Sequence, residues 1–140
     1  MEDQLEKNKA LVRKFVEEIW NQGKMELLEE FYAPSLLADG GLRRFVTSWL
    51  EAFSDTRMTI NSLIAVGDTV VLHETTRAVH TGVWEWTLGG MSMAVPPTGK
   101  EVTDQWIGIL RIADGKIVES SCVLTSLELA QQLGVVPSSG

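Results

Sequence analysis

The hydrophobic residues change their spacing near Arg57, and this change limits the fold more than any other feature of the sequence. Before Arg57, apolar residues recur at the 3.6-residue spacing of helices. After it, apolar and polar residues alternate, which is typical of strands with one buried face. The chain is therefore expected to fold as helices followed by a sheet, an α+β arrangement.

Helices are expected in three segments of the first half, at residues 4–22, 24–33 and 41–54. In the first, Asp3 is placed as an N-cap and Gly23 as a left-handed stop. Pro34 ends the second segment, because proline cannot continue a helix. Trp20 and Trp49 lie on the apolar stripes of the first and third segments and are assigned to the core.

The second half is expected to form a meander of five or six mainly antiparallel strands. They are placed at residues 58–66, 69–81, 84–88, 91–95, 101–112 and after Gly115. Gly89-Gly90 is a two-residue turn signal, and counting outward from it pairs Trp86 with Met93 and Trp84 with Val95. A short helix over residues 127–133 follows the last strand.

The last hairpin is expected to turn through Ala113-Asp114-Gly115, with Gly115 left-handed. A three-residue loop pairs Gly108 with Ser120 and Trp106 with Cys122, whereas a two-residue loop shifts this register by one. Both faces of the hairpin are apolar: Ile107, Ile109, Ile117 and Val123 on one side, and Trp106, Leu110, Val118 and Leu124 on the other. One face is expected to meet the helices and the other a second copy, giving a homodimer.

Length and charge narrow the function classes. At 140 residues the chain is expected to form one domain, 1–140, with an ordered core over about 4–134. A net charge of −7 argues against nucleic acid and anionic membranes as partners. One cysteine and two histidines argue against a zinc site, so no metal is expected. Without a signal-peptide pattern or a long apolar run, a cytoplasmic location is expected.

Several turn and strand-end motifs resemble the SnoaL-like polyketide cyclase family, which belongs to the nuclear-transport-factor-two-like superfamily with limonene epoxide hydrolases and ketosteroid isomerases. They are Asn21-Gln22-Gly23, Phe31-Tyr32-Ala33-Pro34, Ala65-Val66-Gly67-Asp68, His80-Thr81-Gly82, Pro96-Pro97-Thr98-Gly99-Lys100 and, above all, Ile109 to Glu119. The resemblance covers nearly the whole chain. It implies a cone in which helices cap a strongly curved sheet around an apolar pocket, commonly in a homodimer, with no cofactor demanded by any motif.

The resemblance also implies where proton-transferring groups should lie, and this chain departs there. The cyclases have an aspartate acid/base three positions after the Ile117-Val118-Glu119 stretch, where this sequence has Cys122. Their histidine on the preceding strand corresponds to Gly108. Because Gly108 and Cys122, with Ser120 nearby, replace larger polar groups, a larger and less polar pocket is expected.

Two carboxylates are candidates for the missing acid/base. Strand alternation places Asp104 on the face of Trp106, where a carboxyl beside an indole would act as a general base near neutral pH. The alternative places Asp104 at an exposed strand end. Glu74 lies either in the pocket or on the surface, paired with Arg77 or His73.

The candidate ligand-binding residues are Tyr32, His80, Trp106, Gly108, Ser120 and Cys122. Tyr32 either donates a hydrogen bond to a ligand or packs in the core. His80 has the strand parity of Glu74 but lies about 20 Å away along the strand, so the two could contact only separate parts of one ligand. Cys122 is either a nucleophile or a small buried apolar residue.

Three functions are compatible with these residues. The first is a cofactor-independent cyclase or isomerase in which Asp104 or Glu74 removes a proton next to a carbonyl group of a small hydrophobic molecule. The second is a binding module without catalysis, consistent with the absent acid/base pair. The third is a hydrolase similar to limonene epoxide hydrolases, whose water-activating aspartate would have to come from a position other than 122.

Overall fold

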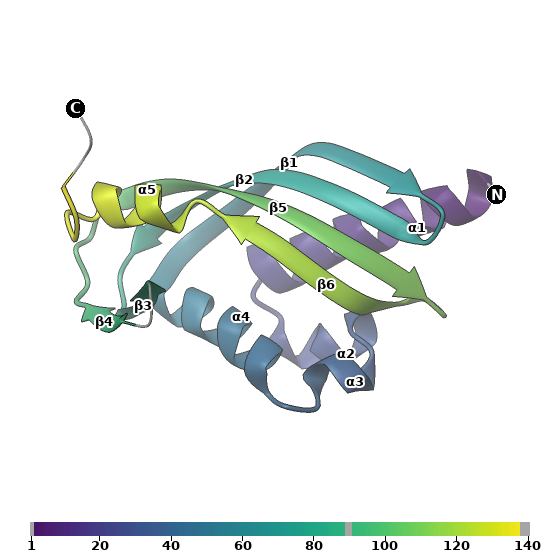
Figure 1. Cartoon of the computed structure of the whole chain (residues 1–140), viewed down its shortest axis with the longest axis horizontal. Coiled ribbons are helices and arrows are strands. Elements are labelled where there is room, and N and C mark those ends of the chain that lie inside the picture. Colours follow the sequence, from purple (N-terminus) through teal and green to yellow (C-terminus); the bar gives the residue numbers. More distant parts are fainter. Residues whose placement is uncertain (1, 89–90, 138–140) are drawn as a thin grey trace.

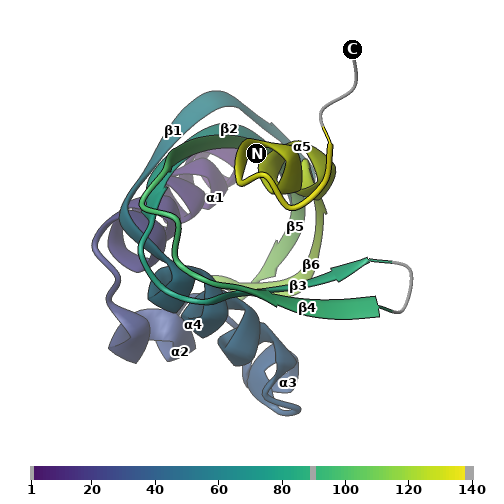
Figure 2. The ribbon, with the colours of Figure 1, turned by 90° about the vertical axis from the view of Figure 1, so that its left-hand side faces the viewer.

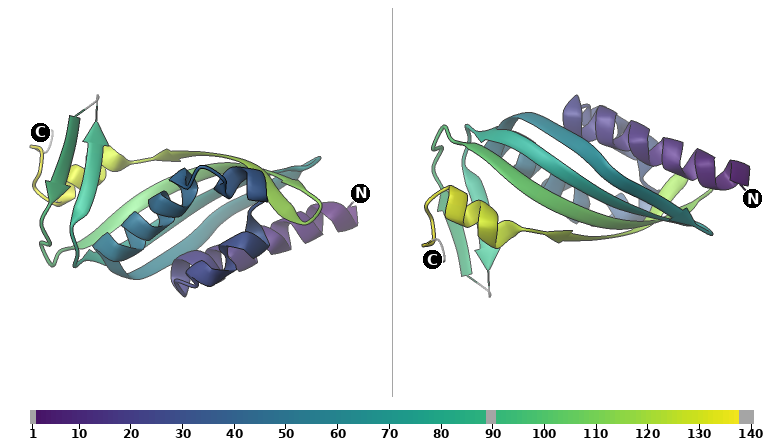
Figure 3. Two further views of the ribbon diagram at one scale, coloured as in Figure 1. Left: turned by 90° about the horizontal axis from the view of Figure 1, so that it is seen from below. Right: turned by 90° about the horizontal axis from the view of Figure 1, so that it is seen from above.

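The computed structural model describes residues 2–88 and 91–137. In these residues, four antiparallel strands form a curved sheet of order β1-β2-β5-β6, and β3 and β4 form a separate hairpin. Helices α1 to α4 lie on one side of the sheet, and α5 lies at the end of the sheet near the C-terminus (Figures 1 and 3). This is the expected α+β cone. No helix in the described part of the chain is long and apolar enough to cross a bilayer.

The helices differ from the expected ones in several details. They are α1 (Glu2–Phe15), the π-helix η1 (Val16–Asn21), the 3₁₀ turn η2 (Met25–Leu27), α2 (Leu28–Phe31), α3 (Pro34–Leu37), α4 (Gly41–Ala52) and α5 (Ser126–Gln132). Asp3, the expected N-cap, lies inside α1, and the expected helix over residues 24–33 is a 3₁₀ turn followed by a short helix. The first expected helix changes to π geometry at Val16. Pro34 starts α3, because a first-turn proline leaves no hydrogen bond broken. The third helix ends at Ala52, since Phe53 is already extended and pairs with His80.

The sheet consists of β1 (Phe53–Val66), β2 (Thr69–His80), β5 (Glu101–Ala113) and β6 (Lys116–Leu124). β1 has a register shift between Ile60 and Ser62, so the alternation read from the sequence does not continue through it. Met58 is buried before the shift. Beyond it, Ile64 and Val66 face outward, 55% and 72% exposed.

The register expected for the last hairpin is wrong by two residues. Asp114 and Gly115 both have left-handed backbones (φ 52° and 74°), so they form a two-residue turn that pairs Ala113 with Lys116. A further irregularity after Arg111 pairs Gly108 with Cys122 and Trp106 with Leu124. A two-residue shift preserves the faces of the strand, so Trp106 and Gly108 still face inward. Ile117 is fully buried, contrary to the expected outward face, because the bulge lies between it and the rest of β6.

The β3 (Trp84–Leu88) and β4 (Met91–Val95) hairpin has the expected register, with Trp84 opposite Val95 and Trp86 opposite Met93. It projects away from the cone (Figure 2). The expected Gly89-Gly90 turn lies outside what the structure describes. Trp84 and Val95 are buried at the base of the hairpin and join it to the core.

Candidate functional site

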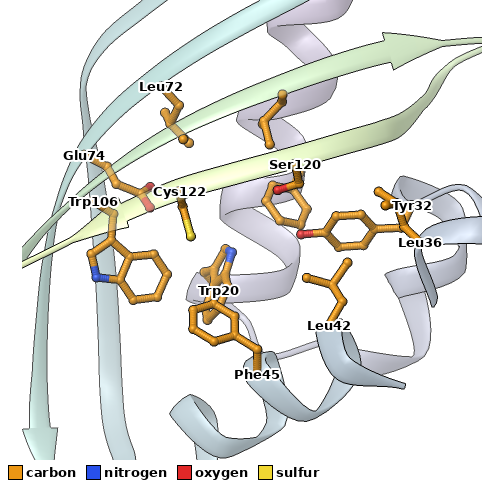
Figure 4. Close-up of a pocket in the computed structure, with 13 residues that line it drawn as sticks. Trp20, Tyr32, Leu36, Leu42, Phe45, Leu72, Glu74, Trp106, Ser120 and Cys122 are labelled. Atoms are coloured by element: carbon orange, nitrogen blue, oxygen red, sulfur yellow. The ribbon is translucent and has the colours of Figure 1, made fainter. Parts of the chain in front are cut away.

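A cavity of about 300 Å³ lies between the concave face of the sheet and the helices (Figure 4). Its walls are mostly apolar. The lining residues are Phe15, Trp20, Tyr32, Leu36, Leu42, Phe45, Leu72, Glu74, Trp106, Gly108, Leu110, Ser120 and Cys122. Phe45, Ser120 and Cys122 are also exposed, so the cavity opens between α4 and the edge strand β6.

Aromatic rings from three elements form one wall of the cavity. The ring centroids of Trp20 (η1) and Trp106 (β5) lie 4.9 Å apart in an edge-to-face arrangement. Phe45 of α4 lies 5.9 Å from Trp106 and 6.1 Å from Trp20. These geometries are typical of favourable aromatic pairs, so this wall is held together by its own contacts as well as by burial.

The π-helix explains how Trp20 reaches this wall. In π geometry, hydrogen bonds join residues five apart rather than four, so side chains five apart are brought toward the same face. Phe15 and Trp20 have this spacing, and both line the cavity. The apolar stripe correctly indicated that Trp20 is buried, at 5% exposed. Its position in a ligand-sized cavity depends on the π turn, which the spacing of apolar residues did not predict.

Glu74 supplies the ionisable carboxyl group of the cavity. It lies in the middle of β2, opposite Trp106, and is only 3% exposed. No described residue hydrogen-bonds to its Oε2 atom. Burial raises the pKa of Glu74 to about 8, because the charged form loses its hydration. The surface alternative, in which Glu74 pairs with Arg77 or His73, is therefore wrong.

Gly108 leaves open space beside Glu74. A Cβ atom built on Gly108 would have Ser121 O, at 4.0 Å, as its nearest described neighbour. Gly108 pairs with Leu72 of β2 on one side and with Cys122 of β6 on the other. The position without a side chain therefore lies between the β2 and β6 walls of the cavity. Figure 4 shows the Glu74 carboxyl and the Cys122 sulfur projecting into the cavity. Burial, and then the nearby Glu74, raise the pKa of the Cys122 thiol, which favours its neutral form.

Tyr32 and Ser120 bring hydroxyl groups to the cavity. Tyr32 is held by a parallel bridge to Ile117, and the next residue, Ala33, donates a 2.9 Å backbone hydrogen bond to Ile117 O. Its hydroxyl points into the cavity (Figure 4). Burial, and then Cys122 and Glu74, raise the pKa of Tyr32, so the phenol is a hydrogen-bond donor at neutral pH. Ser120 lies on β6, two residues from Cys122.

Asp104 is buried on the inner face but does not line the cavity. Its Oδ2 accepts a 2.8 Å hydrogen bond from the indole nitrogen of Trp106. Its Oδ1 accepts hydrogen bonds from the Gln105 backbone, at 3.0 Å, and from the Thr125 hydroxyl. The alternative that places Asp104 at an exposed strand end is wrong, and both carboxylate oxygens accept hydrogen bonds from the protein. The general-base role expected for Asp104 is therefore not supported, because its carboxylate does not border this cavity.

His80 also lies outside the cavity, although it is completely buried. The Thr98 backbone N–H donates to Nδ1 at 3.2 Å, and the Thr98 hydroxyl lies 3.0 Å from the same nitrogen. The His80 ring also lies 5.2 Å from that of Phe53. His80 therefore anchors the turn before β5, and its expected contact with the ligand of Glu74 is not supported by its position.

Six of the eight predicted site residues thus line the cavity: Glu74, Tyr32, Trp106, Gly108, Ser120 and Cys122. Their functional roles stay predictions. Sequence reasoning did not assign Phe15, Phe45, Leu42 or Leu72 to the site, because a helical or strand apolar stripe does not reveal which of its members border a void. Leu36 was missed because α3 was not expected.

The family model of SnoaL-like polyketide cyclases matches residues 10–133. The cone and its interior cavity define the class of protein, and this match shows the family: the chain belongs to the SnoaL-like polyketide cyclases. A search of curated proteins gave no significant match.

Solved structures have the same fold. AclR from Streptomyces galilaeus, described as "a putative hydroxylase", is 27% identical, with a TM-score of 0.80 over 97% of this chain and 86% of AclR. TsrD from Streptomyces laurentii is 22% identical, with a TM-score of 0.74 over 93% and 96% of the two chains. A "putative polyketide cyclase" from Acidithiobacillus ferrooxidans is 22% identical, with a TM-score of 0.73 over 92% and 95%.

Proposed function

We propose that the cavity binds a small, largely apolar organic molecule and that Glu74 exchanges a proton with it, in a cofactor-independent cyclase- or isomerase-type reaction. Family membership supports the class of reaction. The observation that carries the proposal is the carboxyl of Glu74, which is buried in the cavity with an oxygen that has no hydrogen-bond partner in the described residues. A buried polar group without a partner costs free energy of folding, so its retention indicates a use for it.

Glu74 suits proton transfer because burial raises its pKa to about 8. A general acid or base works best when its pKa is near the operating pH, since both forms are then available. The ionised form would remove a proton beside a carbonyl group, and the protonated form would return it elsewhere on the same molecule. Tyr32, whose phenol is neutral, would donate a hydrogen bond to the oxygen that gains negative charge.

The family's usual acid/base positions take other roles in this proposal. Cys122 and Gly108 make room for the ligand, and neither is assigned a proton transfer. A hydrolase similar to limonene epoxide hydrolases has less support, because it would need a water-activating aspartate, whereas position 122 is a cysteine and the one carboxylate among the described lining residues is Glu74.

Activity with a substrate found by screening tests the proposal. Glu74→Gln should lower kcat by about 10²–10⁴-fold while KM changes little, since the amide keeps the shape but cannot transfer the proton. Glu101→Gln, which changes an exposed carboxylate on β5, is the matched control and should retain full activity. Undiminished turnover of the Glu74→Gln variant would overturn the catalytic part of the proposal.

A second candidate is a binding module without catalysis. The observation in its favour is that Cys122 and Gly108 occupy the positions where the family's acid/base residues are expected. In this case native mass spectrometry should recover a bound hydrophobic molecule chemically unchanged after long incubation. Recovery of an isomer or a ring-closed product of equal mass, separated by chromatography, would exclude this candidate.

We also propose that the outer face of the sheet binds a second copy of the chain. Ile107, Ile109 and Val123 are 42%, 51% and 67% exposed there, and β1 contributes Ile64. Ile64, Val71 and Ile109 form one cross-strand row, and Ile107 pairs with Val123 in the next. Exposed apolar patches of this kind are typical of interfaces.

The oligomeric state tests this interface. Ile109→Glu should convert a dimer to monomers in analytical ultracentrifugation, because a carboxylate would be buried without a partner. Thr59→Glu is the control, since Thr59 is exposed on β1 outside the row of Ile64. A wild-type protein that sediments as a monomer at high concentration would overturn the proposed interface.

A further inference from the structure

We infer that the ligand of the cavity carries a protonated amine, which pairs with the Glu74 carboxylate beside the aromatic wall formed by Trp20, Phe45 and Trp106. This inference rests on the proposed function, because it takes the cavity to be a ligand site, and it adds the chemical class of the ligand. It begins from two properties of the walls: their charge and their aromatic content.

The described walls of the cavity can carry charge of one sign only, the negative charge that Glu74 gains as the pH rises through its pKa of about 8. Glu74 is the carboxylate among the described lining residues, and these include no lysine, arginine or histidine. The other titratable groups that face it are the Cys122 thiol of β6 and the Tyr32 phenol beyond α2, whose pKa values are both raised, so both are neutral near pH 7. α1, α4, β1 and β5 contribute no charged side chain to the lining. A ligand cation would therefore supply the counter-charge that the protein does not.

The aromatic wall is placed to assist the same cation. Glu74 and Trp106 are directly opposite on neighbouring strands and face the same side, so their side chains are neighbours. The ring centroid of Trp20 lies 4.9 Å from that of Trp106, and the ring centroid of Phe45 lies 5.9 Å from it. A cation within about 6 Å of a ring centroid is attracted by the ring, most strongly for tryptophan. A carboxylate with adjacent indoles thus favours an ammonium group.

The remaining walls fit the hydrocarbon part of such a ligand. Leu36, Leu42, Leu72 and Leu110 also line the cavity. A small hydrophobic amine would bury its carbon skeleton against these side chains while its nitrogen reaches Glu74. The formal charge of −7 on the whole chain would add long-range attraction for a cation.

A ligand that carries a carbonyl group but no amine is the competing interpretation. It would accept a hydrogen bond from protonated Glu74, whereas an ammonium group requires ionised Glu74. The pKa of Glu74 in the empty cavity is about 8, and that of an alkyl ammonium group is about 10. Amine binding should therefore strengthen as the pH rises toward 8. Below pH 8, amine binding should release the proton of Glu74. Carbonyl binding should weaken above pH 8.

Three probes of equal size separate these interpretations: 3-phenylpropylamine, 3-phenylpropan-1-ol and butylbenzene. Binding is followed by tryptophan fluorescence and by calorimetry in buffers of different ionisation enthalpy. The amine should bind about tenfold or more tightly than the alcohol at pH 8. Its affinity should fall by about tenfold per pH unit below the pKa of Glu74, with net proton release. Butylbenzene affinity should not depend on pH.

The variant Glu74→Gln should abolish the preference for the amine and retain butylbenzene binding. The pH series on the wild-type protein provides the same test without any variant. If the alcohol or butylbenzene binds as tightly as the amine at pH 8, the inference is wrong while the proposed apolar ligand site stands. If none of the three probes binds, both the inference and the proposed ligand site are wrong.

Discussion

Two carboxylates on the inner face of the same sheet have opposite surroundings. Glu74 and Asp104 are each 3% exposed, and each lies beside Trp106 in sequence or across the strands. Asp104 accepts hydrogen bonds from Trp106, Gln105 and Thr125, whereas Glu74 has a free oxygen in a cavity. Two carboxylates with the same exposed fraction can therefore have different roles. A saturated buried carboxylate stabilises the fold, and an unsaturated one that faces a void is available to a ligand.

Among the substitutions that test this contrast between Glu74 and Asp104, Glu74→Gln should have the largest effect, and it acts on the pH dependence of the free energy of unfolding. Because the pKa of Glu74 rises from 4.5 to about 8 on folding, the folded chain binds more protons than the unfolded chain between these values. Its contribution to stability is therefore complete below pH 4.5 and is lost as the pH rises through 8. The slope reaches at most about 1.4 kcal/mol per pH unit.

Urea unfolding across this pH range checks the prediction. The free energy of unfolding of the wild type should fall relative to that of the Glu74→Gln variant as the pH rises, so that the variant is the more stable protein above pH 8. The Glu101→Gln control should follow the wild type. Parallel curves for wild type and Glu74→Gln would show that Glu74 is hydrated or paired, and the contrast with Asp104 would disappear.

Asp104→Ala should have the next largest effect, with the opposite sign. The substitution leaves the buried Trp106 indole N–H without its acceptor, whereas the Gln105 backbone N–H keeps Thr125 Oγ1 at 3.1 Å and the Thr125 hydroxyl keeps Gln105 O at 3.4 Å. The expected loss is about 1–3 kcal/mol, because this is the cost of an unsatisfied buried donor. Denaturant unfolding at pH 7 measures it.

Glu119→Ala is the matched control for Asp104→Ala. Glu119 also accepts a hydrogen bond, from Arg111 at 2.8 Å, but this pair is exposed. Its loss should cost much less than the loss of Asp104, because water screens an exposed ion pair. Equal losses for the two substitutions would contradict the structural role given to Asp104.

Gly108→Val tests the space beside Glu74 with a smaller expected effect. The added side chain would occupy the gap between Glu74 and Cys122, so butylbenzene should bind about tenfold more weakly, while stability should change by less than about 1 kcal/mol. Ile107→Val, which changes the adjacent outward-facing residue, should leave binding unchanged. Unaltered binding by Gly108→Val would place the ligand elsewhere.

The smallest expected effect concerns His80, at the other end of β2. Burial lowers the pKa of His80, because the imidazolium would lose its hydration. Its contribution to stability is therefore complete above the unfolded value of 6.5 and is lost as the pH falls from there toward the folded pKa, opposite in direction to Glu74. An NMR titration should show the His80 ring protonating below pH 6.5. Protonation at or above 6.5 would contradict the buried, neutral ring.

Strand alternation was sufficient to place Trp106 and Gly108 on one face, because within a strand a side chain's face depends only on parity. Cys122 shares that face because the bulge after Arg111 restores the parity that the two-residue turn changes. Strand alternation was insufficient where a bulge intervenes: Ile117 faces inward and Ile64 outward, against the pattern in the sequence. The register of the last hairpin also depended on turn geometry and a bulge, which local residue types left open.

The sequence by itself determined the order of helices and strands, and that Asp104, Trp106 and Gly108 share one face of β5. These properties follow from local periodicity and from residue identity. Only the tertiary structure decided that Glu74 faces a void while Asp104 is enclosed by donors. The Thr125 hydroxyl comes from a segment 21 residues away, and the void is bounded by side chains from helices and strands far apart in the chain. The environment of a carboxylate is set by such distant neighbours, which no local pattern in the sequence records.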